Sequence, residues 1–529
     1  MALNPEGAKT QEPLVDISFE QNPLDGKVDS RVSLKLLGTT IYYNVFFLTS
    51  VLRFFQPKKQ HADTISAIIN ATEATVEGWS TQTRMGIESL LEDHKTLDLN
   101  LDLQAPLIII PTDPKNWDSP CTIIDTGHIY VTSEVNSKEK LGELKQLSVD
   151  EYAKIDNEEI SRLMYDRFQI VSQDTQFLVG PTIQSTLSSI SESLVVNDYC
   201  ILNKLKLEIT LDISILPKAF KLPKTKIFAH LPKLNLSYND YQYKIMMELF
   251  QNIIPQTDIT LSEDTMISYP NSSDDNLLKL DQTRLAANLD MLNKMQPLQI
   301  EQTQFAVCLK IDTIQFSVLK CTDTTLMKCD RLVNLIGDNV AFDLNKKVKD
   351  MKINMSVQGL HLEDFIENSN IEEFKYLISS NAETQDNDKN LFNINYSRSQ
   401  RIVTHDSTLI EVFDQDIDIG LTKLMVTLTP RSILTLLNYT VSTFTNPQEE
   451  MPSDVLKHNS EDRDDSPQKI NMNVSIDGIV IYLNDNNEKL ATLDISTGRF
   501  TMLLLPTSMK VSSTIDGMDL LDNLTVSEV

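Results

Sequence analysis

Glycine and basic residues are both scarce in this sequence of 529 residues. Glycine occurs 14 times and proline 20 times, so the chain is neither collagen-like nor of low complexity. Lysine and arginine total 47 against 75 acidic residues, and the resulting net charge of -28 repels phosphate backbones. Nucleic acid is therefore not expected as a partner. Apolar residues make up 41% of the chain and charged residues 23%, which is typical of a folded protein.

Long apolar runs and paired cysteines are also missing. The most apolar run, 45–55, is broken by Arg53 and is far shorter than the roughly 20 residues that a transmembrane helix needs. The first thirty residues are polar and acidic, so no signal peptide is predicted. The five cysteines never form a Cys-x-x-Cys pair, which favours a reduced compartment. We expect a cytoplasmic protein that does not cross a bilayer.

Motifs for phosphate binding, nucleophilic catalysis and metal coordination are absent from the sequence. It contains no GxxxxGK[ST], GxGxxG or GxSxG, and its seven histidines are scattered without HExxH spacing. The triplet Asp125-Thr126-Gly127 matches aspartic proteases, but these enzymes need a second such aspartate to share a proton, and none occurs. We interpret the triplet as a turn after a strand. No enzyme, no metal and no cofactor are predicted.

Apolar and polar residues alternate along many segments, as they do in strands with one apolar face. The pattern is clearest in LDLNLDLQ (97–104) and longest in 204–215, and it recurs at 314–318 and 472–476. We expect a mainly β fold with short helices, built of antiparallel sheet. The apolar positions on these strands are Leu97, Leu99, Leu101, Leu103, Leu205, Leu207, Ile209, Leu211, Ile213, Phe305, Val307, Leu309, Ile311, Met351, Ile353 and Met355.

Three segments suggest an internal repeat. Each of 33–57, 230–255 and 421–447 reads as an alternating strand followed by a short apolar helix that ends at a proline. The segments recur about two hundred residues apart, although coincidence is the alternative because β-rich proteins often place a helix after a strand. In the second and third helices apolar residues line one face, and we expect this face to pack on the sheet.

The repeat divides the chain into units, and two acidic stretches separate them. The stretches 257–276 and 447–469 have too few apolar residues to pack, so we expect exposed, protease-sensitive loops. The predicted organisation is 1–57, the end of a first unit; 58–255, a second unit with a helical region at 61–95; 256–281, an acidic loop; 282–447, a third unit; 448–468, an acidic linker; and 469–529, the start of a fourth unit.

Three stretches in order, LDLNLDLQAPLIIIP (97–111), IIDTGHIYVTS (123–133) and YDRFQIVSQDTQFLVGP (165–181), resemble the chorein family, the vacuolar protein sorting-associated protein 13 family of bridge-like lipid transfer proteins. The similarity is closest over 97–255 and rests beyond it on the strand–helix repeat. It implies an elongated, repeating β-groove of curved antiparallel sheets with an apolar concave face. The alternating residues named above are then candidates for lining a lipid groove.

The resemblance also implies a function. It implies bulk transport of glycerophospholipids between membranes at organelle contact sites, in support of vacuolar protein sorting, by a protein that is peripheral to membranes and that uses adaptor proteins. The basic N-terminal segment and C-terminal membrane-binding domains of the family are not recognisable, so we expect an internal fragment. The alternative from the residues alone is a non-enzymatic protein-interaction scaffold with closed β-sandwich cores and acidic recruiting loops.

Overall fold

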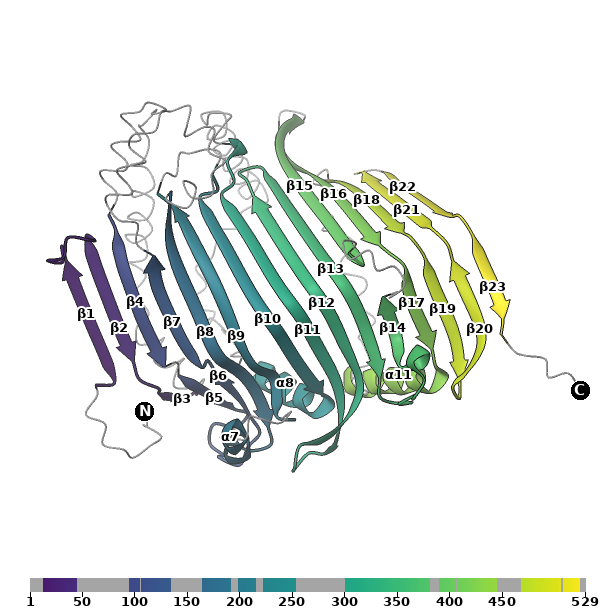
Figure 1. Cartoon of the computed structure of the whole chain (residues 1–529), viewed down its shortest axis with the longest axis horizontal. Helices are drawn as coiled ribbons and strands as arrows, with labels where there is room; N and C mark the ends of the chain where they lie inside the picture. Colours follow the sequence, from purple (N-terminus) through teal and green to yellow (C-terminus); the bar gives the residue numbers. More distant parts are fainter. Residues whose placement is uncertain are drawn as a thin grey trace, which may run out of the picture.

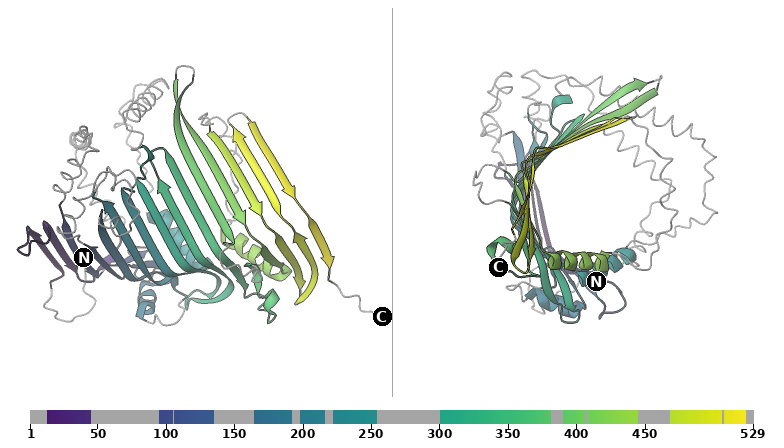
Figure 2. Two further views of the ribbon diagram at one scale, coloured as in Figure 1. Left: turned by 45° about the horizontal axis from the view of Figure 1, so that its top comes forward. Right: turned by 90° about the vertical axis from the view of Figure 1, so that its right-hand side faces the viewer.

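In the computed structural model, 23 strands form a single curved sheet (Figures 1 and 2). The predicted mainly β, open architecture is confirmed. Among the described residues no second sheet packs face to face on the first, so the closed sandwich of the alternative interpretation is not found there. The structure describes residues 13–44, 95–104, 106–134, 164–191, 198–215, 222–253, 300–380, 390–405, 408–444, 468–505 and 508–523.

The strands form two rows that share their long central members. The long strands are β8 (Tyr165–Gly180), β9 (Cys200–Ser214), β10 (Thr225–Asn239), β11 (Phe305–Asp323), β12 (Lys328–Lys346) and β13 (Asp350–Asp364). The upper row of Figure 1 adds β1 (Val15–Gln21), β2 (Ser30–Leu36), β4 (Leu97–Gln104), β7 (His128–Glu134), β15 (Phe392–His405), β16 (Thr408–Leu421), β18 (Gln468–Ile476), β21 (Gly498–Leu505) and β22 (Ser508–Ile515). The lower row adds β3 (Thr40–Tyr42), β5 (Leu107–Pro111), β6 (Cys121–Asp125), β14 (Tyr376–Ser380), β17 (Leu424–Leu428), β19 (Ile479–Asp485), β20 (Glu488–Ile495) and β23 (Met518–Asp522).

A line of backbone irregularities, here called the crease, separates the two rows. Pro232 lies within β10 and has no partner in the ladder with β11, and Asn339 in β12 and Asp174 in β8 adopt positive φ angles of 49° and 60°. On the flanks the strands break, as at Gly127 between β6 and β7. Proline cannot donate to the strand ladder and a positive φ turns the backbone, so the sheet can bend along this line. Figure 2 shows the upper row bending toward the side on which α8 and α11 lie.

Between the strands that the structure describes, parallel pairing occurs at three joints, whereas the other pairs are antiparallel. The parallel joints are β2–β4 with β3–β5, β10–β11, and β16–β18 with β17–β19. A parallel joint needs a long crossover, often helical. Two of the predicted strand–helix segments supply one: β10 runs into α8 (Asp240–Ile253), and β17 precedes α11 (Pro430–Phe444). The first predicted helix, the helical region 61–95 and the acidic stretches lie wholly or almost wholly outside the described residues, and the unit boundaries stay a prediction.

The densest packing lies where helices cover the lower ends of β8 and β9. On one face Leu178 and Cys200 pack against Ile183 of α7 (Ile183–Ser191). On the other face Phe177 and Val179 pack with apolar side chains of α8. The helices therefore lie on opposite sides of the lower row, and the face that carries Phe177 is the one that α8 covers.

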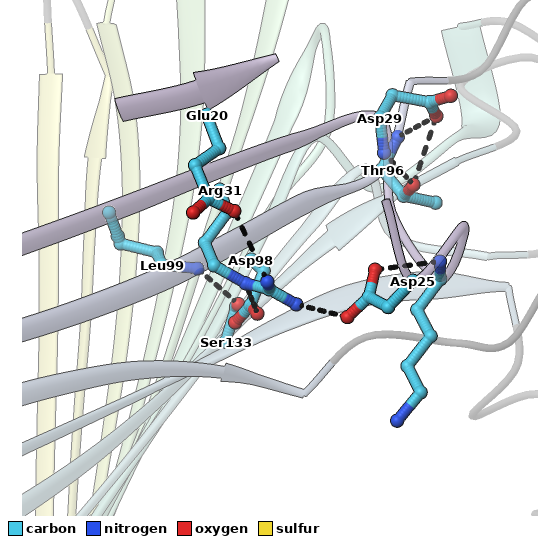
Figure 3. Close-up of polar contacts among 9 residues, drawn as sticks. Glu20, Asp25, Asp29, Arg31, Thr96, Asp98, Leu99 and Ser133 are labelled. Atoms are coloured by element: carbon cyan, nitrogen blue, oxygen red, sulfur yellow. Dashed lines mark hydrogen bonds and ion pairs between the residues drawn. The ribbon is translucent and has the colours of Figure 1, made fainter. Parts of the chain in front are cut away.

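Polar side chains fasten the strands on one face at the N-terminal edge (Figure 3). Arg31 of β2 bonds Asp98 of the neighbouring β4 at 2.9 Å, Asp25 at 2.8 Å and Glu20 of β1 at 3.4 Å. Its guanidinium also lowers the pKa of Asp25 below the usual range. Glu20, Arg31 and Asp98 are register partners, so this cluster joins three strands across one parallel and one antiparallel pairing.

Candidate functional site

One face of the upper row is apolar from strand to strand. Directly paired residues lie on the same face of a sheet, so register can be followed from one strand to the next. The path through Leu309 of β11 is here called the central rung, and it crosses fourteen strands without meeting a polar residue. Its members are Ile17, Leu34, Leu101, Val131, Ile170, Ile209, Ala229, Leu309, Phe342, Met355, Ile394, Ile419, Val474 and Phe500.

The opposite face of the same strands is polar. Moving one residue along each strand gives a path of which only Tyr130, Val171 and Ala341 are apolar. The other members are Asp16, Lys35, Asp102, Glu208, His230, Lys310, Ser356, Asn393, Gly420, Ser475 and Arg499. A single layer of sheet thus separates an apolar from a polar surface, as period-two alternation requires.

The apolar face is three rungs wide and is here called the upper band. On β11 its rungs pass through Val307, Leu309 and Ile311. The first of these rungs is apolar or aromatic on every strand from β8 to β22, and the third is interrupted at Ser172 of β8 and Gly498 of β21. At about 3.4 Å per residue the band is about 14 Å wide, and at about 4.8 Å per strand the central rung is about 60 Å long. This is a long, narrow apolar track.

Polar residues border the upper band on both sides. The rung through Phe305 includes Asp166, Lys346 and Arg398. The rung on the other side includes Lys233, Thr313, Asp338 and Gly359. The band is therefore a bounded stripe rather than a uniformly apolar sheet.

All sixteen residues predicted from alternation lie on this one face, because their strands are linked by the same register. Eleven of them lie in the three rungs, and the rest fall at the borders. Among the border residues Leu97 is 38% exposed, Ile213 43% and Phe305 52%. The eleven residues of the three rungs are half-buried, except Ile311, which is buried. Whether these residues contact lipid stays a prediction.

A second apolar rung, which sequence analysis did not single out as a site, crosses the lower row. On β11 the apolar positions change from odd numbers, ending at Ile311, to even numbers, beginning at Ile314. The lower rung passes through Leu202, Leu236, Phe316, Leu335, Leu362, Ile378, Val426, Ile481, Leu493 and Leu520. Leu202 pairs with Phe177, so this rung lies on the face that α8 covers. The shift in alternation at 311–314 was the available sequence signal.

Helix α11 is oriented opposite to expectation, and the prediction that its apolar face packs on the sheet was wrong. Its buried residues are Ser432, Tyr439 and Thr443, and Ser432 Oγ hydrogen-bonds the Asp364 carboxylate. The side of α11 that carries Ser432 therefore lies against the strand end at Asp364. The apolar side chains that remain 41% to 57% exposed on α11 are Ile433, Leu434, Leu437, Val441 and Phe444.

Helix α8 combines packed and exposed apolar residues. Ile245 and Leu249 are buried against the sheet, whereas Met247 is 40% and Phe250 54% exposed. Tyr243 of α8 meets Phe444 of α11 edge-on, with ring centroids 4.8 Å apart. The two helices therefore present neighbouring apolar surfaces on the side toward which the sheet bends (Figure 2).

The Asp125-Thr126-Gly127 triplet forms the turn between β6 and β7. The backbone N–H of Gly127 donates to Asp125 Oδ1 at 3.0 Å, and Gln176 Nε2 donates to Asp125 Oδ2 at 2.8 Å. Among the described residues, no three His, Cys, Asp or Glu side chains are grouped as metal ligands would be. No helix in the described part of the chain is long and apolar enough to cross a membrane.

An open curved sheet with one continuous apolar face defines a chorein-type β-groove protein. Comparison with known families agrees, because the model of the VPS13-like family N-terminal region matches residues 2–306. The chain belongs to the VPS13-like family.

The most informative relatives are called intermembrane lipid transfer proteins. VPS13 of Chaetomium thermophilum is 27% identical over 98% of this chain and 18% of its own length. VPS13A of Mus musculus is 26% identical over 47% of this chain and 8% of its own, and VPS13C of Homo sapiens is 23% identical over 49% and 7%. The chain therefore spans less than a fifth of the length of these relatives.

Proposed function

We propose that this chain is a lipid-conducting segment in which the acyl chains of glycerophospholipids lie along the upper band. The observation that carries the proposal is the central rung, which stays apolar across fourteen consecutive strands. Moving an acyl chain of about sixteen methylenes into water costs about 13 kcal/mol. A track without polar interruptions lets a lipid move across the strands without meeting that cost.

The crease has a role in this proposal. In a regular strand Ile311 and Ile314 would lie on opposite faces. In the proposed track the irregular backbone at Pro232 and Asn339 turns the strands between these positions, so that the upper band and the lower rung would both face the concave side. The exposed apolar residues of α8 and α11 then form a floor next to the track, and the polar border rungs leave headgroups in water.

The wider activity is proposed for the longer protein of which the relatives are examples. In it, this segment contributes to bulk lipid transport between apposed membranes at contact sites, in support of vacuolar protein sorting. The protein is cytoplasmic, peripheral to membranes and non-enzymatic, and adaptor proteins recruit it. The names of the relatives support the lipid cargo and the membranes as partners.

Native mass spectrometry of the purified chain tests the proposal. We expect several glycerophospholipids of mixed headgroup to co-purify, because Leu, Ile and Val side chains bind acyl tails without reading headgroups. Detergent-free, monodisperse protein that carries no lipid would contradict the proposal. That result would favour the protein-interaction scaffold.

A variant of α11 tests the helix floor separately. Replacing Leu434 and Leu437, 57% and 55% exposed, with serine should reduce the bound lipid and change the free energy of unfolding by less than about 1 kcal/mol. As a control, Tyr439→Ala removes a side chain that is 7% exposed, and it should destabilise the protein by about 3 kcal/mol. Unchanged lipid content in the double serine variant would show that α11 does not contribute to lipid binding.

A further inference from the structure

Two cysteines face each other across the hairpin of β11 and β12. Cys321 and Cys329 are directly paired in the antiparallel register, and each thiol affects the pKa of the other. Directly opposed residues in such a ladder have Cα atoms about 4.5 to 5.5 Å apart. Disulfides span Cα separations of about 4.4 to 6.8 Å, so the backbone already holds the pair at bonding distance.

The pair is fixed from both sides at the start of α8. The backbone N–H of Cys321 donates to Asp240 Oδ1 at 2.8 Å, and that of Cys329 donates to Asp198 Oδ2 at 3.1 Å. Asn239 Nδ2 donates to the Cys329 sulfur at 3.4 Å. These contacts hold the hairpin against the β10–α8 junction and leave both thiols partly accessible.

The other cysteines lack this arrangement. Cys308, also partly accessible, is paired with Asp343 on β12 and so has no thiol opposite it. Cys121 and Cys200 are buried in the cluster beneath α7, and their register partners are Gly180 and Leu178. Cys321 and Cys329 are therefore the one pair of described cysteines that lie opposite each other in the sheet.

We propose that Cys321 and Cys329 are a redox-modification site, a dithiol that closes to an intrachain disulfide in the presence of peroxide. The Cys321 thiolate attacks one peroxide oxygen, which gives a sulfenic acid and releases water after protonation. The Cys329 thiol loses its proton and displaces a second water from that sulfur. Two sulfur atoms lose two electrons in total, and one peroxide becomes two waters.

The two thiols have different roles in this reaction. Burial raises the pKa of both, and more strongly that of Cys329. The neighbouring Cys329 thiol partly offsets the rise in the pKa of Cys321, so Cys321 is the better attacking thiol of the two. The disulfide would link the tips of β11 and β12 beneath α8 without changing the strand register.

Peptide mapping tests the site directly. Trypsin cleaves after Lys320, Lys328 and Arg331, so the two cysteines fall in separate peptides, 321–328 and 329–331. After treatment of the full chain with hydrogen peroxide and alkylation of free thiols, we expect these peptides to appear joined and to separate on reduction. Far-ultraviolet circular dichroism should not change.

Single-residue variants test the roles proposed for the individual cysteines. In Cys329→Ser the sulfenic acid at Cys321 cannot be resolved, so dimedone labelling of Cys321 should rise severalfold over the native chain. Cys308→Ser should leave the joined peptides unchanged. The proposal is overturned if Cys321 and Cys329 oxidise separately to sulfinic acid, or if the peptides 321–328 and 329–331 are not joined after peroxide treatment.

Discussion

Three charges placed on the upper band should separate lipid binding from folding. The perturbation is the triple replacement of Leu207, Ile209 and Leu211 of β9 with glutamate, which adds three negative charges to one face. If this face carries acyl chains, the charges make it a poor apolar surface, because an unpaired carboxylate is strongly disfavoured beside hydrocarbon. Lipid binding should then be lost.

The structure sets the size of the stability cost. All three side chains are half-buried, so each contributes about 1 kcal/mol of the 1.5 to 3 kcal/mol that full burial provides. Lower strand propensity adds up to about 1 kcal/mol each, for a total of about 3 to 6 kcal/mol. In a closed core each unpaired charge would cost about 3 to 5 kcal/mol, and the total would exceed the stability of most domains.

Circular dichroism melts beside a fluorescent-lipid binding assay measure both quantities. The matched control is Lys206→Asp with Thr210→Asp, which lowers the charge by the same amount on the polar face of β9. The control should keep both the melt and lipid binding. If the triple variant unfolds globally and the control does not, the open face is refuted. If the triple variant still binds lipid, the lipid track is refuted.

Two tight local contacts give further tests in urea melts. Arg167 and Asp212 form two hydrogen bonds of 2.7 and 2.8 Å, and Asp212 is 7% exposed, so Asp212→Asn should cost about 3 kcal/mol. Adding Arg167→Met should recover part of the loss, and strictly additive costs would contradict the pairing. At Gly127, with φ +68°, an added Cβ would lie 1.9 Å from the Gln173 carbonyl oxygen, so Gly127→Ala should cost about 3 kcal/mol. Gly26 has φ +67° and open space, so Gly26→Ala should cost only about 1 kcal/mol; equal costs would show that the contact does not matter.

The sequence was sufficient to predict which side of each strand is apolar. Period-two alternation is a local property. In segments such as Leu97–Leu103 or Leu205–Ile213 it permits only one choice of which side chains share the apolar face. It also located α8 and α11, because an apolar period of 3.6 residues follows an alternating strand. These predictions depend only on neighbours along the chain.

Register between strands could not be predicted in the same way. The central rung joins Ala229 to Leu309 across a parallel joint whose strands are separated by α8 and the chain beyond it. No turn fixes the register of such a pair. A slip of one residue would have placed Leu309 opposite His230 and broken the apolar path.

The orientation of α11 shows a second limit. The stripe Ile433, Leu437, Val441 and Phe444 predicted a packed face by the usual rule that apolar residues of a helix face the core. That rule holds only where the surface beneath is apolar. Here the surface includes Asp364, and Ser432 and Tyr439 turn toward the sheet instead.

An open apolar face places weak demands on sequence. A residue in a closed core must fit its neighbours on every side, so adding or removing even one methylene group changes the stability of the protein. Ile209 and Leu309 of the upper band are only half-buried, so either could be exchanged for another apolar residue at little cost in stability. Two features must be kept: apolar residues at the same alternate positions of each strand, so that they share one face, and the length of the strands. A relative that is 27% identical over 98% of the chain is what such a constraint allows, because it fixes hydrophobic character at alternate positions rather than side-chain shape.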